Sequence, residues 1–125
     1  EYLTPIPAHT WSRLILQRLC LMVEDIEWFA SMEDERKLLR SLIAMNDPTL
    51  FDILAVSPQL SEKQRAGWSY AGFKGGSEPG VLNLTWLLKD EAGRWHMLAA
   101  SWLDRQAPVD NAALGLIAVR ILALR

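Results

Sequence analysis

The fold is decided by residues 67–104, which read GWSYAGFKGGSEPGVLNLTWLLKDEAGRWHMLAASWLD. Two turn-like breaks, Gly75–Gly80 and Asp90–Arg94, divide this stretch into three apolar, aromatic-rich runs. Such runs between clusters of Gly, Pro and Asp predict strands, so we expect a three-stranded antiparallel meander. The first strand is predicted to end in a cation, two glycines and a serine, Lys74–Ser77. The residues Lys74–Ser77 are therefore the first candidates for a functional site.

Helical patterns precede the strands. Apolar residues three and four apart predict a long helix over residues 11–30, followed by a second over about 32–45. The acidic residues of these two helices could form a surface for a partner, but a solvated helix face is favoured; they are Glu24, Asp25, Glu27, Glu33, Asp34 and Glu35. A short third helix should begin at Thr49, which can cap it, and residues 61–65 read as a helical turn or loop.

The last predicted helix covers residues 111–124. Its apolar residues recur at helical spacing, and we expect them to pack on the meander. Helices, then antiparallel strands, then a terminal helix, with no βαβ alternation, predict an α+β fold in a single domain spanning residues 1–125. The predicted apolar stripe consists of Ala113, Leu114, Ile117, Ile121 and Leu124.

The composition excludes several classes of protein. Thirteen Lys and Arg against fifteen Asp and Glu give a net charge of −2 without a basic block, so no nucleic-acid partner is expected. The apolar run 112–119 is far short of the roughly 20 residues of a membrane-spanning helix. A single cysteine allows no internal disulfide. His9 and His96 lack ligand-type neighbours at metal-site spacing, so we expect neither a metal nor another cofactor.

The run 74–83, KGGSEPGVLN, is similar to the Lys-Thr-Gly-Ser-x-x-Gly-Val-x-Asn run of the serine β-lactamases and penicillin-binding proteins. In that family a strand ends in a Lys-Thr/Ser-Gly triad and is followed by a turn, two antiparallel strands and a helix on the sheet. The predicted order of elements from Gly67 onward resembles this arrangement. The resemblance implies that the chain is the C-terminal part of a larger β-lactamase-like fold.

The resemblance also implies roles for individual residues. Lys74 would lie beside the active-site groove as a catalytic cation that orients a substrate carboxylate, and the main-chain N–H of Ser77 would form half of an oxyanion hole. Gly75, Gly76 and Asn83 would contact the substrate. The substrate would be a small molecule or peptide whose amide or ester is cleaved by acyl transfer.

The sequence departs from the family pattern at several points. Gly75 stands where relatives have Thr or Ser, and Leu82 where many have Arg. No serine is followed three positions later by lysine, so this chain alone supplies no activated nucleophile. Either the serine lies in a missing N-terminal part of the same fold, which we favour, or the chain is a degenerate relative that binds a protein or peptide without catalysis. By resemblance, the protein is expected in the periplasm or outside the cell.

Simpler interpretations of the same residues stay open. Lys74 can be a solvated lysine at a strand end, and the nearby glycines ordinary turn residues. A phosphate-binding loop is disfavoured because its lysine follows the glycines and precedes a helix. The glycosylation sequon Asn83-Leu84-Thr85 falls in a predicted buried strand and is interpreted as a coincidence.

Overall fold

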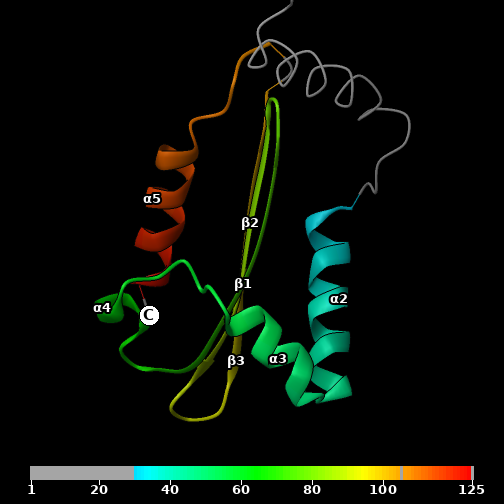
Figure 1. The fold of residues 1–125 in the computed structure, drawn as a ribbon, viewed down its shortest axis with the longest axis vertical. Helices are drawn as coiled ribbons and strands as arrows, with labels where there is room; N and C mark the ends of the chain where they lie inside the picture. The colour runs from blue at the N-terminus through cyan, green and yellow to red at the C-terminus, as the bar shows by residue number, and fades with distance from the viewer. Residues whose placement is uncertain (1–29, 105, 125) are drawn as a thin grey trace, which may run out of the picture.

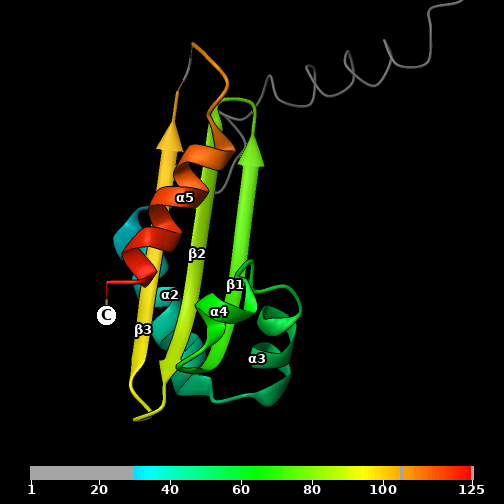
Figure 2. The same cartoon turned by 90° about the vertical axis from the view of Figure 1, so that its left-hand side faces the viewer.

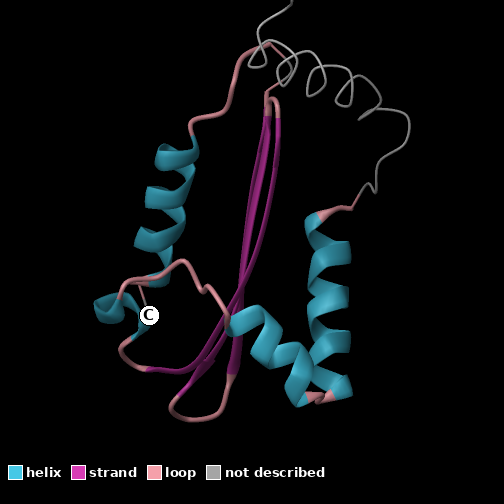
Figure 3. Cartoon of the chain, viewed as in Figure 1, coloured by secondary structure: helices cyan, strands magenta, loops and turns pink. Residues whose placement is uncertain are grey.

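The computed structural model describes residues 30–104 and 106–124. The predicted helix over residues 11–30 therefore lies almost wholly outside the described part. The order of elements is helix, helix, short helix, three strands and helix, an α+β arrangement as predicted (Figures 1 and 3). The elements are α2 (Met32–Met45), α3 (Pro48–Ala55), α4 (Glu62–Arg65), β1 (Trp68–Glu78), β2 (Val81–Asp90), β3 (Trp95–Leu103) and α5 (Asn111–Leu122).

Local side-chain chemistry determines where α2 and α3 begin. Ser31 caps α2 in a reciprocal box with Asp34, in which the Ser31 hydroxyl accepts from the Asp34 N–H at 3.2 Å and the Asp34 carboxylate accepts from the Ser31 N–H at 3.0 Å. Asn46 ends α2 in the left-handed conformation, with φ 50°. The predicted cap of α3 is wrong, because Asp47 caps it by accepting from the Thr49 N–H at 2.8 Å. Pro48 then occupies the first helical position, where no N–H is needed.

The strands form the predicted antiparallel meander in the order β1-β2-β3. The predicted break at Gly75–Gly80 is wrong in its extent, because β1 continues through Gly75 and Gly76 to Glu78, which pairs with Val81. Only Pro79 and Gly80 form the connection, and Gly80 has a φ of +78°. The irregular spacing of aromatic residues in β1 has a cause: a bulge between Trp68 and Tyr70.

Helices cover both faces of the sheet (Figure 1). We call the face toward α2 and α3 the α2 face, and the face toward α4 and α5 the α5 face. Seen from the α5 face, α5 lies across β2 and β3 (Figure 2). The main core is on this face, where Trp86 and Leu88 of β2 pack with Ala71 and with Ala118 of α5. Burial of such apolar side chains is the dominant stabilising contribution to a small domain.

The stripe predicted for α5 is wrong in part. Leu114 and Ala118 are the buried residues of this helix, whereas Ile117 and Ile121 are 54% and 48% exposed. Because nearly every side chain of α5 is apolar, the pattern of the helix alone did not select the face that packs. The exposed residues leave an apolar surface on the side of α5 away from the sheet.

The α2 face has its own aromatic cluster. Phe51 of α3 stacks on Trp95 of β3 with ring centroids 5.3 Å apart, and it meets Tyr70 of β1 edge to face at 5.5 Å. The Tyr70 hydroxyl donates to the Phe51 carbonyl at 2.9 Å. Burial raises the pKa of Tyr70. These contacts fix α3 on the sheet.

Candidate functional site

The residues singled out from the sequence lie near the hairpin end of β1, the strand at one edge of the sheet. Lys74 pairs with Thr85, Gly75 with Leu84, Gly76 with Asn83 and Ser77 with Leu82. The run 74–83, which resembles the β-lactamase pattern, therefore forms the end of the β1–β2 hairpin. Its first half, in β1, lies directly beside its last residues, in β2.

Alternation along the strands separates the predicted residues onto two faces. Side chains of successive residues point to opposite sides of a sheet, and cross-strand partners share a side. Lys74 and Asn83 accordingly lie on the α2 face. The Ser77 side chain lies on the α5 face, where it lines a cavity with Leu82. Only the main chain of Ser77, and not its hydroxyl, can act together with the Lys74 ammonium.

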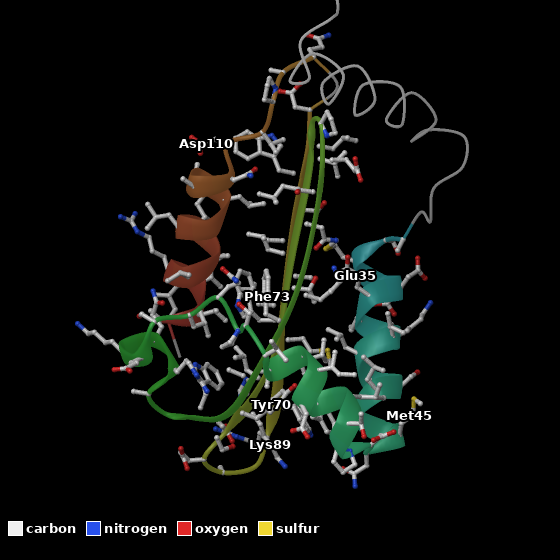
Figure 4. All side chains as sticks on the ribbon, in the orientation of Figure 1. Glu35, Met45, Tyr70, Phe73, Lys89 and Asp110 are labelled. Atoms are coloured by element: carbon white, nitrogen blue, oxygen red, sulfur yellow. The ribbon has the colours of Figure 1, made fainter. Side chains whose placement is uncertain are left out.

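A polar cluster joins α2 to β2 on the α2 face, and we call it the Glu35 cluster. The half-buried Glu35 carboxylate accepts a hydrogen bond from the Thr85 hydroxyl at 2.7 Å through one oxygen and from the Asn83 amide through the other. The Thr85 hydroxyl also lies 3.1 Å from the side-chain amide oxygen Oδ1 of Asn83. Figure 4 shows Glu35 on the side of α2 that faces the sheet. The cluster fixes the Asn83 side chain, which the resemblance assigns to the substrate.

Glu35 and Thr85 were not predicted as site residues. Glu35 belongs to an acidic run that reads as a favourable first turn of a helix. Thr85 belongs to the sequon interpreted as a coincidence. The one available signal was the alternation of β2, which puts Asn83 and Thr85 on the same face within the otherwise apolar run 81–88.

A cavity of about 320 Å³ opens beside the Glu35 cluster. Its polar lining comes from Glu35, Asn83, Thr85 and Lys74, and leucines of α2 and α3 form its apolar wall. The Lys74 side chain is exposed, and its ammonium lies against the carbonyl oxygen of Gly75. The cavity therefore combines one cation, Lys74, one carboxylate, Glu35, and an apolar wall.

A second cavity, of about 500 Å³, lies across the strand on the α5 face. Ser77, Phe73 and Trp86 contribute to its lining, and Figure 4 shows Phe73 on this side of the sheet. Gly75 and Gly76 border both cavities. A Cβ atom added to Gly76 would meet nothing within 4 Å, so the main chain of β1 is bare at this point.

The hairpin at the far end of the sheet carries the second charged constellation. The Asp90 carboxylate accepts from the Arg94 N–H and from its guanidinium, both at 2.8 Å, and lies 3.1 Å from the His96 ring. The Arg94 N–H and the His96 ring hold the pKa of Asp90 well below its usual range. Because all three residues belong to one hairpin, we attribute the cluster to the stability of the turn.

Across residues 30–104 and 106–124, no group of three or more His, Cys, Asp or Glu side chains is placed to hold a metal ion. In the same residues, no helix has the length and apolar character needed to cross a membrane. The arrangement around Lys74 comprises a cation, the main chain of an edge strand and a cavity. In comparisons with known proteins, neither a family model nor a curated protein matches the chain.

Proposed function

We propose that this chain is the C-terminal part of a β-lactamase-like serine hydrolase that carries out acyl transfer on an amide or ester. The nucleophilic serine would come from residues outside these 125. One observation carries the proposal: Lys74–Ser77 lies in an edge strand whose main chain is bare at Gly76 and borders a cavity on each side. A substrate can lie along such an edge and form main-chain hydrogen bonds.

The position of Lys74–Ser77 in the edge strand β1 exposes the atoms that the proposed roles require. The Lys74 ammonium attracts a substrate carboxylate on the α2 face, next to Asn83. The main-chain N–H of Ser77 donates to the oxygen of the carbonyl under attack, where negative charge develops. The Ser77 hydroxyl takes no part in this proposal because it belongs to the opposite face. Gly76 lets the substrate approach the main chain closely.

Two features support the idea that a further part completes the fold. Among the described residues, β3 pairs only with β2, so its other edge is open to another strand. Large apolar side chains are also exposed beside this edge and on α5; Leu103 is 61% exposed and Ile117 54%. Additional strands beside β3 and a helix over α5 would bury this surface, as contiguous exposed apolar patches generally require.

The test is covalent labelling of the full gene product that contains these residues, with a fluorescent penicillin and with a fluorophosphonate probe. We expect the full product to be labelled and the 125-residue chain alone to stay unlabelled. Lys74→Ala should slow labelling by about 10²-fold, comparable with the loss of one oxyanion donor. Lys63→Ala, a lysine on α4 away from the site, should label at the normal rate.

Three outcomes would contradict the proposal: no labelling of the full product by either probe, labelling of the 125-residue chain alone, or normal labelling of Lys74→Ala. The first of these would favour the second candidate function, a non-catalytic module that binds a peptide. The open edge of β3, with Trp102 beside it, favours that alternative, because an extended peptide can add to a free strand.

A further inference from the structure

A groove of about 750 Å³ lies between α2 and β3, on the α2 face. Trp95, Met97 and Ala99 of β3 and Leu39 and Ile43 of α2 give it an apolar lining. It is separate from the cavity beside Lys74, and the proposed hydrolase function leaves it unused. An apolar groove of this kind, between a helix and a strand, fits the apolar face of another helix.

Two arginines, Arg36 and Arg40, also line the groove, one helical turn apart on α2. Arg36 forms an ion pair with Glu33 at 2.6 Å. Within residues 30–104 and 106–124 the exposed Arg40 forms no ion pair, and its charge acts on Glu33 over a longer distance, so its guanidinium can pair with an acidic group of an occupant. A complementary occupant therefore carries an apolar stripe flanked by acidic groups.

We propose that residues 11–29 of the same chain occupy this groove. Their sequence has the required chemistry: Leu19, Met22, Val23 and Ile26 recur at helical spacing. On a helix, Asp25 and Glu27 flank that stripe on its two sides, near the end of the segment that joins α2.

The connection to α2 makes this segment the favoured occupant. Residue 29 is three peptide units from Met32, which lines the groove, so their Cα atoms are at most about 11 Å apart. As a helix, residues 11–29 would extend about 28 Å, enough to cover the roughly 21 Å length of α2. A tethered segment acts at an effective concentration on the order of millimolar, well above that of a free partner. Running back along α2, it brings Asp25 and Glu27 toward Arg36 and Arg40.

The test is disulfide cross-linking in the 125-residue chain with Cys20 replaced by serine. Leu19→Cys with Ile43→Cys puts one thiol on the apolar stripe and the other in the groove. Leu19→Cys with Ser41→Cys is the matched control, since Ser41 lies at the same level of α2 but does not line the groove. A disulfide needs Cα atoms within about 4.4–6.8 Å of each other. Cross-linking therefore shows which face of α2 the segment contacts, as well as its position along that helix.

After mild oxidation of dilute protein, we expect loss of both free thiols and a monomeric cross-link in the Ile43 variant only. Disulfide-linked dimers would overturn the proposal in favour of a second copy of the chain as occupant. Equal cross-linking of the two variants, or none in folded protein, would overturn it as well.

Charge reversal gives an independent measurement if a cysteine variant does not fold. Arg40→Glu should lower the melting temperature, and adding Asp25→Lys should recover part of that loss. Strictly additive effects of the two substitutions would contradict the proposed contact.

Discussion

Replacing Glu35 by alanine should destabilise the domain much more than the same change two residues earlier in the helix. The Glu35 carboxylate accepts from Thr85 at 2.7 Å and from Asn83, residues about fifty positions away in the sequence. Truncation removes the acceptor of both hydrogen bonds and the polar link between α2 and β2. It also frees the Asn83 side chain beside the cavity that Lys74 lines.

The magnitude follows from the number and kind of these bonds. A hydrogen bond to a charged group contributes about 1.5–3 kcal/mol. All three side chains of the cluster are half-buried, so water can replace part of the lost interaction. We therefore place Glu35→Ala at about 2–3 kcal/mol and Thr85→Val, which removes one of the two bonds, at about 1 kcal/mol. In the double variant the losses should not add, with a coupling energy of about 1 kcal/mol.

The assay is urea unfolding followed by tryptophan fluorescence. Glu33→Ala is the control, because Glu33 is also in the first turn of α2 and contributes the same favourable charge near the helix N-terminus. Among the described residues, Glu33 forms a surface ion pair with the neighbouring Arg36, so its loss should be small. Equal losses for Glu33→Ala and Glu35→Ala would refute this account, as would additive effects of Glu35→Ala and Thr85→Val.

Two further predictions concern the turns. Gly80→Ala should cost more stability than Gly93→Ala. Both glycines have φ near +80°, a conformation that costs other residues about 1–2 kcal/mol. At Gly80, but not at Gly93, the new Cβ would also clash with the carbonyl oxygen of Asp104. Equal losses in urea unfolding would contradict the steric account. Because the folded pKa of Asp90 is depressed, its stabilisation is present above the unfolded value of about 3.9 and is lost as the pH falls below it. Asp90→Asn should therefore flatten the decline of stability in acid, and parallel curves for the two proteins would contradict this.

Much of the fold could be predicted from the sequence because the relevant interactions are local. Ser31 and Asp34 form a capping box three residues apart, and the turn from Asp90 to Arg94 closes through the Asp90 side chain. The alternation of turn residues and apolar runs was sufficient to predict a meander. These features depend on neighbours in the chain, which the sequence displays directly.

Only the tertiary structure decided the details that matter for the candidate site. The sequence pattern predicts that Gly75 and Gly76 are turn residues. They are strand residues because each pairs with a residue of β2, Gly75 with Leu84 and Gly76 with Asn83. The buried side of α5 was set by contact with the sheet, since an almost wholly apolar helix presents no preferred face.

The Glu35 cluster shows the same division. The sequence by itself determined that Glu35 starts a helix and that Asn83 and Thr85 share one face of a strand. That these three side chains meet was decided by the packing of α2 on the sheet, which joins residues about fifty positions apart. Local sequence preferences cannot predict a contact between residues so far apart, because the contact stabilises the fold only after α2 has packed on the sheet.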